Sequence, residues 1–394
     1  LTIVSFPALL SKTYKMLRMK QVRHQLFFLT LPLATLATLA PLTIALAQQV
    51  TSDGTVSTTV TTPDGKNFNI NDGTRRGGNL FHSFKEFSVP TGGSANFNNA
   101  ADVRNIIGRV TGGSVSNIDG LIKALGNANL FLLNPAGIIF GPNARLNIGG
   151  SFVGSTANSF VFDNNFEFSA TDPQAPPLLT INIPIGLRFR DNPQNITNQS
   201  RAVDNSGNLV GLTVPSGNSL TLVGGNVSLD NGILFAPGGR IELGGLSTAG
   251  TVGLNGDGSL SFPVGVQTAD VSLTNGAGVD VSSGGGGSIA VNARNLEMAE
   301  GSYLQAGIGQ GLGTVGSQAG DITLNASGTT TVANSFVENR VESGAVGNSG
   351  NIVIETGKLN LSNGGQIAAY TLGQGNAGNL TVNASDSVEL NGEG

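Results

Sequence analysis

The chain of 394 residues contains no cysteine and no tryptophan, and only 11% of its residues are charged. The absence of cysteine excludes a cysteine nucleophile, a cysteine-based zinc site and any disulfide bond. Only one of the two histidines, His82, lies beyond the first 47 residues, so catalysis that needs several histidines is excluded as well. With 39% hydrophobic residues, the chain does not have the composition of a disordered protein, which is poor in hydrophobic residues and rich in charge.

The one long hydrophobic stretch runs from Leu26 to Ala47 and has the features of a targeting segment. Five basic residues and no acidic residue precede it, and Ala45-Leu46-Ala47 followed by Gln48 is a small-residue cleavage site. The stretch is long enough to be a transmembrane helix, but Pro32 and Pro41 interrupt it. We expect residues 1–47 to be a signal peptide and Gln48 to be the mature N-terminus.

The rest of the chain carries 15 basic and 25 acidic residues, which disfavours binding to nucleic acid. It contains 58 glycines, with many Val, Ile, Leu, Thr and Asn residues, a composition typical of short strands joined by tight corners. Phenylalanine is unevenly spread, since 13 of the 19 lie between Phe68 and Phe189.

The C-terminal part of the chain is repetitive. Equivalent apolar residues recur at steps of 33, 30 and 28 residues, at Ile289, Ile322, Ile352 and Leu380. A second apolar residue follows each of them two positions later, and a second strand repeats as KLNLS (358–362) and SVELN (387–391). QIAAYT (366–371) is a third short element, and residues 219–245 contain comparable strands with Gly or Asn corners.

Alternation with a period of two predicts strands with one face inward, and a repeat of about thirty residues predicts a solenoid. We therefore expect an all-β fold, a right-handed parallel β-helix in which stacked Asn side chains form ladders. The alternative is a sandwich of hairpins, because Asn231-Gly232, Asn275-Gly276 and Asn363-Gly364 are hairpin signals. Residues 284–287, all glycine, are either a flexible linker or a corner.

The most informative run is GNANLFLLNPAGIIFG (126–141), in which two apolar bursts are joined by Asn134-Pro135-Ala136-Gly137. Asn, Pro and Gly at the first, second and fourth positions favour a type I turn. Ala136 tolerates a positive φ poorly, so a type II turn is disfavoured. We expect the Asn134 side chain to accept a hydrogen bond from the backbone two residues on.

Residues 126–157, with the upstream segment GGNLFHSFKEFSVPTGG (77–93) and its continuation to residue 122, resemble the filamentous-haemagglutinin N-terminal domain. This is the secretion domain of exoproteins exported by two-partner secretion, and the similarity covers at least residues 50–165, most like the cyanobacterial versions. The family usually has Asn where this chain has Ala136 and often has Pro where it has Ala128.

The resemblance implies a parallel β-helix with an irregular N-terminal cap and extra-helical strands. It implies a secretion domain over residues 48–280, followed over 281–394 by the first repeats of a longer shaft. It also implies export through the periplasm to the cell surface or medium by an outer-membrane two-partner transporter with periplasmic receptor domains. The residues that it marks as a secretion motif are Asn127, Asn129, Leu130, Asn134, Pro135 and Gly137.

The resemblance favours an adhesin or haemagglutinin-like protein, with host, cell or polysaccharide surfaces as candidate targets. The alternatives are the delivery stalk of a toxin or cytolysin whose effector lies beyond residue 394, or a β-helical polysaccharide-acting enzyme. For the enzyme, Asp163 with Glu167, or Asp64 with Asp72, could form a glycosidase pair. Isolated carboxylates on solvated faces are commoner, and His82 lies among aromatic residues, so we expect no catalytic residue, cofactor or metal.

Overall fold

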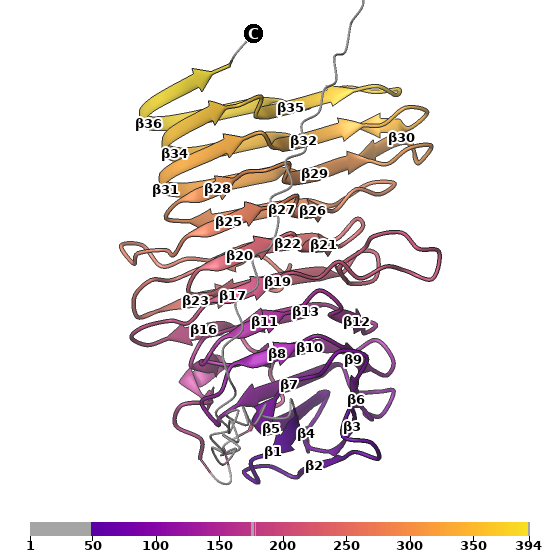
Figure 1. Cartoon of the computed structure of the whole chain (residues 1–394), viewed down its shortest axis with the longest axis vertical. Helices are drawn as coiled ribbons and strands as arrows, with labels where there is room; N and C mark the ends of the chain where they lie inside the picture. The colour runs from indigo at the N-terminus through magenta and orange to yellow at the C-terminus, as the bar shows by residue number, and fades with distance from the viewer. Residues whose placement is uncertain (1–48, 175–176, 178, 393–394) are drawn as a thin grey trace, which may run out of the picture. The chain divides into compact units, whose positions relative to one another are not determined.

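The computed structural model describes residues 49–174, 177 and 179–392, which form a nearly all-β unit of stacked coils (Figure 1). Each coil contributes strands to parallel sheets, and the strands of successive coils pair side by side in register. The expected parallel β-helix is therefore confirmed. In the described part of the chain, the one helical element is the short 3-10 turn η1 (Asp163–Asn165), and no helix there is long and apolar enough to cross a membrane.

Three stacks of parallel strands make up the coil. The first stack consists of β5 (Asn79–Phe87), β7 (Asn105–Val110), β10 (Asn129–Leu133), β13 (Phe152–Ser155), β19 (Ser219–Gly224), β22 (Arg240–Gly245), β27 (Ser288–Ala293), and the first halves of β31 (Ile322–Ala333), β34 (Ile352–Ser362) and β36 (Leu380–Asn391). The second consists of β8 (Ser116–Ile118), β11 (Ile138–Phe140), β17 (Ile196–Asn198), β20 (Val227–Asp230), β25 (Val271–Thr274), β28 (Leu296–Met298) and the second halves of the same three long strands.

The third stack has two segments. One consists of β3 (Asn67–Asp72), β6 (Ser94–Phe97), β9 (Leu121–Ala124) and β12 (Arg145–Asn147). The other consists of β18 (Leu212–Thr213), β21 (Ile233–Phe235), β26 (Gly278–Asp280), β29 (Tyr303–Ile308), β32 (Phe336–Val341) and β35 (Gln366–Thr371), and a small ladder joins β30 (Gly313–Gln318) to β33 (Val346–Asn348).

The repeat seen in the sequence is the register of the first stack. Ile289, Ile322, Ile352 and Leu380 are successive Cα partners on neighbouring parallel strands. The first three are buried in the core, as expected. Leu380 occupies the same register position as the partner of Ile352, but it is 47% exposed. It lies in β36, which has a neighbouring strand on only one side within the described residues, so nothing there covers its other side.

The Asn-Gly pairs are corners and not hairpins. Asn231, Asn275 and Asn363 adopt positive φ angles of 59°, 58° and 51°. Each follows a strand of the second stack and turns the chain toward the third stack, whose strands run parallel to their neighbours. Asn tolerates the left-handed conformation better than other non-Gly residues, which explains why it recurs there. The glycines at 284–287 also form a corner, since Gly286 bridges to Ala319 of the next coil.

A second core lies outside the coil and contains part of the phenylalanine cluster. The antiparallel sheet of β14 (Ser159–Val161), β15 (Glu167–Ser169), β16 (Gly186–Phe189), β23 (Gly250–Leu254) and β24 (Leu260–Ser261) forms it with the outward face of the first stack. Phe81 on β5 meets Phe168 of this sheet edge to face, with 5.2 Å between the ring centroids. The extra-helical strands thus bury residues that a simple coil would expose to water.

The N-terminal cap consists of antiparallel additions to the first coil. β1 (Val50–Ser52) and β4 (Thr74–Arg76) pair with β5, and β2 (Thr58–Thr61) pairs with β3. These strands occupy edges that parallel coil strands would otherwise leave unpaired. Phe68, Phe84 and Phe97 are buried beneath them.

Candidate functional site

The turn between β10 and β11 has the predicted geometry. The Gly137 amide donates to the Asn134 carbonyl at 3.1 Å, and the Ala136 amide donates to Asn134 Oδ1 at 2.9 Å. Ala136 does not have a positive φ, which rules out type II, while Gly137 has φ +117°. Because an L side chain is strained at that φ, glycine is required at the fourth position.

Asn134 connects three consecutive coils. Its side-chain amide donates to the Ser114 carbonyl and to Ser116 Oγ of the preceding coil, both at 2.9 Å. Its backbone amide donates to the Ser155 carbonyl of the following coil, also at 2.9 Å. The residue is 0% exposed. In the folded domain its side chain therefore holds coils together and is not available to a partner at the surface.

Asn129, at the start of β10, also links successive coils. It belongs to a ladder of stacked Asn side chains of the kind expected from the sequence. Its amide donates to Asn105 Oδ1 at 3.0 Å, and the amide of Asn105 donates to Asn79 Oδ1 at 2.9 Å. Asn129 Oδ1 accepts from the Ser151 backbone at 2.8 Å, which extends the ladder to the next coil. Asn79 in turn donates to the Thr180 and Asn182 carbonyls, so the ladder also fixes an extra-helical segment.

The remaining members of the predicted motif divide between core and surface. Leu130 is 1% exposed and belongs to the main hydrophobic core. Pro135 is half-buried, and Asn127 is exposed. The motif therefore presents Asn127 and part of the Pro135 corner to solvent, while Asn129, Leu130 and Asn134 act within the fold. The predicted cleavage residues Ala45, Ala47 and Gln48 lie outside the described residues.

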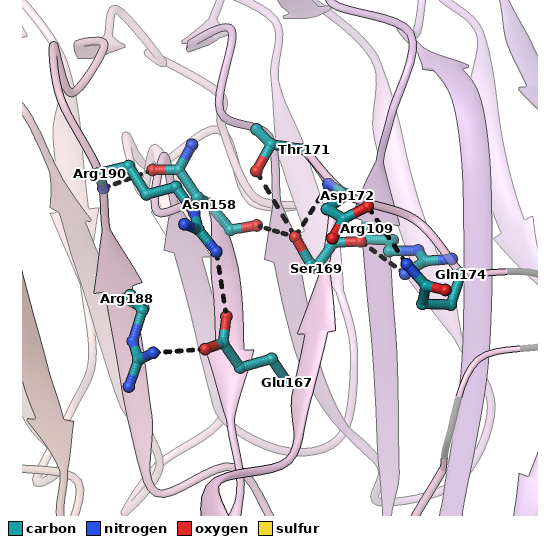
Figure 2. A network of polar contacts seen from close by, with 9 residues as sticks. All are labelled: Arg109, Asn158, Glu167, Ser169, Thr171, Asp172, Gln174, Arg188 and Arg190. Carbon is teal, nitrogen blue, oxygen red and sulfur yellow. Dashed lines mark hydrogen bonds and ion pairs between the residues drawn. The ribbon is translucent and has the colours of Figure 1, made fainter.

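A buried arginine that the sequence reading did not single out links the coil, the cap and the extra-helical sheet. Arg109 on β7 is 1% exposed; Nε donates to Ser83 Oγ at 2.8 Å and one terminal nitrogen donates to Thr55 Oγ1 at 2.8 Å. The other terminal nitrogen donates to the Ser169 carbonyl on β15, which Figure 2 shows from close by. The guanidinium lies 4.1 Å from the centroid of the Phe168 ring.

The charge of Arg109 is balanced through two hydroxyl groups. Ser83 Oγ and Thr55 Oγ1 each accept from Arg109 and donate to Asp53, at 2.6 and 2.8 Å. Burial raises the pKa of Asp53, but hydrogen bonds from Ser83, Thr55 and Thr111 outweigh it and hold the pKa below its ordinary value. Burial lowers the pKa of Arg109 to about 10, so both groups are charged at neutral pH. In the sequence, the sign that Arg109 is buried is its position within the otherwise apolar strand NIIGRV.

The extra-helical sheet adds a second set of polar contacts beside Arg109. Glu167 pairs with Arg188 at 2.5 Å and with Arg190 at 3.7 Å, and Figure 2 shows the three side chains converging. Ser169 Oγ also accepts from the Asp172 backbone at 3.1 Å, which holds the chain as it leaves β15. Glu167 is thus used to join β15 to β16.

The carboxylates considered for catalysis form separate structural contacts. Both oxygens of Asp163 accept from the Asn182 amide, at 2.7 and 2.6 Å, while Glu167 is paired with arginines. Asp64 accepts from the backbone amides of Lys66 and Asn67, which lowers its pKa to about 2, and Asp72 accepts from Thr59. Neither pair shares a hydrogen-bond partner, and among the described residues no group of His, Asp and Glu could hold a metal ion.

Besides Arg109, the buried side chains of His82 and Glu242 also have strongly shifted pKa values. His82 is 1% exposed, packs against Phe84 and Phe97, and contacts Thr58 through Nδ1 at 3.1 Å. Burial lowers its pKa to about 4, against the opposing effect of Asp72. Glu242 on β22 is 1% exposed, and burial raises its pKa to about 7 despite its ion pair with Arg240 at 2.5 Å.

The fold is shared with a solved secretion domain. The crystal structure of the HMW1 secretion domain from Haemophilus influenzae is similar over 88% of this chain and 84% of that chain, with a TM-score of 0.56 and 18% identity. The filamentous hemagglutinin secretion domain aligns over 88% of this chain and 100% of that chain, with a TM-score of 0.38 and 15% identity. No curated protein sequence matches the chain. The family model of the TPS secretion domain matches residues 48–291, more than half of the chain. The chain therefore belongs to the family of TPS, or two-partner secretion, secretion domains.

Proposed function

We propose that residues 48–280 are the secretion domain that an outer-membrane transporter recognises, and that residues 281–394 are the first coils of a longer shaft. Domains of this family belong to exoproteins that outer-membrane two-partner transporters export. The change at about residue 280 is supported by the outward face of the first stack. On that face Gly244 on β22 is buried, whereas its successive register partners, Asn292 on β27 and Asn325 on β31, are partly open to solvent.

Within the secretion domain, Asn129 and Asn134 act by closing the first coils. The observation that carries this is the bridge that Asn134 makes from a fully buried position to the coils on either side. A transporter that contacts the folded domain cannot touch this side chain. The motif therefore serves export as a fold-initiating element, and the exposed Asn127 is the motif's asparagine that a folded-state receptor could contact directly.

The test is secreted yield with the cognate transporter, paired with the stability of the purified chain. Asn134→Ala is expected to reduce both the secreted yield and the free energy of unfolding, whereas Asn127→Ala should leave both near wild type. Pro135→Ala is expected to reduce export while the purified chain still folds. If Asn127→Ala abolished export without a change in stability, the motif would act as a surface contact and the fold-initiating role would be refuted.

We assign the exported protein to the adhesins, located at the cell surface or in the medium after passage through the periplasm. A long stack of parallel coils, which repeats the same strands along its outer faces, suits display and attachment. Delivery of a toxin or cytolysin remains the alternative. Binding of cells or isolated surface polysaccharide by the purified exoprotein tests the adhesin role, and lysis of target cells without attachment would refute it.

Export through the periplasm also requires a targeting segment, which we assign to residues 1–47. Cleavage after Ala47 would give a mature protein that begins at Gln48. Mass spectrometry of the exported protein measures this terminus directly. A terminus that retains Leu26–Ala47 would show that the stretch is an anchor.

A further inference from the structure

A groove of about 780 Å³ runs along the outside of the coil where the extra-helical cover ends. Its floor is the outward face of the first stack, where Asn292, Asn325 and Glu355 are successive Cα partners on β27, β31 and β34. Asn383 on β36 continues the row. In the earlier coils the equivalent positions of the same row, Gly244, Val223 and Ser155, are buried. The row therefore marks a change in the character of this face.

One end of the groove is closed by the segment that follows β24. Phe262 lies over Gly244, the register partner of Asn292 on β22, and a Cβ at Gly244 would come within 2.9 Å of the phenyl ring. Phe262 and Val266 give the groove an apolar wall at this end, and both are half-buried. Ser327 and Ser385 line it farther along. The result is a polar floor with an aromatic surface at one end.

The polar groups on the floor are only partly used by each other. The Asn325 amide donates to Asn292 Oδ1 at 3.0 Å, and the Asn383 amide donates to Glu355 at 2.6 Å. Within the described residues, these bonds engage neither the amide nitrogen of Asn292 nor the side-chain oxygen of Asn325. Donors and acceptors therefore alternate along the groove at the spacing of the coils, about 4.8 Å.

We propose that this groove binds a neutral glycan chain, with sugar hydroxyls hydrogen-bonded to Asn292, Asn325 and Glu355 and one ring packed against Phe262. Amide side chains suit sugar hydroxyls because each offers both a donor and an acceptor. The coil spacing is close to the length of one pyranose unit, so successive units meet successive coils. The proposal rests on the adhesin function and names the class of ligand that the adhesin would hold.

The lining distinguishes this ligand from others. Among the described lining residues the charged side chains are Arg294 and Glu355. Arg294 is already paired with Asp270 at 2.5 Å, so an acidic polymer would find no unpaired cation and would meet the Glu355 carboxylate. The strands β27, β31 and β34 have partners on both sides, which leaves no open edge there for an extended peptide to join.

The experiment is titration calorimetry of the purified mature chain with cellohexaose, chitohexaose and mannohexaose, with hexagalacturonate as the acidic comparison. At least one neutral hexasaccharide is expected to bind with a Kd on the order of 1 mM or tighter. Asn325→Ala and Phe262→Ala should each weaken that binding by about fivefold or more, the effect of losing one hydrogen bond or one packing contact. The matched control is Asn376→Ala, which removes an exposed Asn side chain outside the groove.

The results of the glycan titration can be distinguished from those of the export and adhesion experiments. Failure of all three neutral probes, preference for hexagalacturonate, or equal weakening by Asn376→Ala would each overturn the glycan site. Circular dichroism of the variants checks that the coil is retained, and Phe262→Ala gives an independent reading if Asn325→Ala disturbs the Asn ladder. Export and the adhesin role are measured by secreted yield and cell attachment, so either can stand if this groove binds nothing.

Discussion

The contribution of Asn134 to stability can be worked out from its contacts. Asn134→Ala removes the donor to the Ser114 carbonyl, the donor to Ser116 Oγ and the acceptor for the Ala136 amide. At about 1 kcal/mol for each net hydrogen bond, the loss is about 3 kcal/mol. Ser114 is exposed, so water can replace one partner, whereas Ser116 is 0% exposed and stays unpaired. The expected range is therefore about 2–4 kcal/mol.

Equilibrium denaturation of the purified chain in urea measures this change, and two further variants separate its parts. Asn134→Asp keeps the acceptor for Ala136 but loses both donors and sets a carboxylate against the Ser114 carbonyl, so it should be at least as destabilising as Asn134→Ala. Asn127 belongs to the same motif but is exposed, so Asn127→Ala should change the free energy of unfolding by less than about 0.5 kcal/mol. The reasoning fails if Asn134→Ala lies within that same margin of wild type.

Three further predictions concern the cap, the coil spacing and pH. Arg109→Met leaves Asp53 without its buried counter-charge and should cost about 3–5 kcal/mol. Arg75→Met breaks an exposed pair with Asp102 and should leave the denaturation midpoint close to that of wild type, so midpoints that fall equally would contradict this. Gly149→Ala should prevent normal stacking, because its Cβ would lie 2.0 Å from the Gly126 carbonyl oxygen, while Gly256→Ala, with nothing within 4 Å, should melt like wild type. The lowered pKa of His82 contributes stability that is fully present above about pH 6.5 and is lost as the pH falls toward 4. The raised pKa of Glu242 contributes stability that is fully present below about pH 4.5 and is lost as the pH rises through 7. Each shift corresponds to about 3 kcal/mol, and because the two shifts have opposite signs, their effects on stability oppose each other between pH 4 and 7. Glu242→Gln should therefore make the loss of stability on acidification steeper, and His82→Gln should make it shallower. Free energies of unfolding measured from pH 4 to 7 that keep the wild-type slope in both variants would refute this.

The repeat and the turn could be predicted because they depend on local patterns. Alternating apolar residues with a common register fix which face of each strand is buried, and Ile289, Ile322 and Ile352 stack as their spacing indicated. The Asn134 turn follows from the φ limits of Pro135, Ala136 and Gly137. Asn-Gly pairs were ambiguous, because a left-handed Asn serves a hairpin and a corner equally well.

The partners of polar residues far apart in sequence could not be predicted in this way. Alternation places Arg109 and Glu242 on the outward face of their strands, where water would be the default neighbour. The extra-helical strands β15 and β24 begin some 58 and 18 residues farther along the chain and lie against Arg109 and Glu242, and both side chains are buried. Whether Asn134 is read by a partner or buried within the fold was equally undecided until the neighbouring coils were placed around it.

The sequence by itself therefore determined the all-β class, the parallel coil, the turn at Asn134 and the family, since each depends on residues close together or on a simple period. Only the tertiary structure decided which outward faces are covered, that Arg109 is balanced by Asp53 through two hydroxyl groups, and where an open polar groove begins at Asn292. The physical reason is that burial and pairing are properties of neighbours in space. In a solenoid the next coil is about thirty residues away and can be anticipated, whereas an extra-helical segment that returns to the coil follows no period.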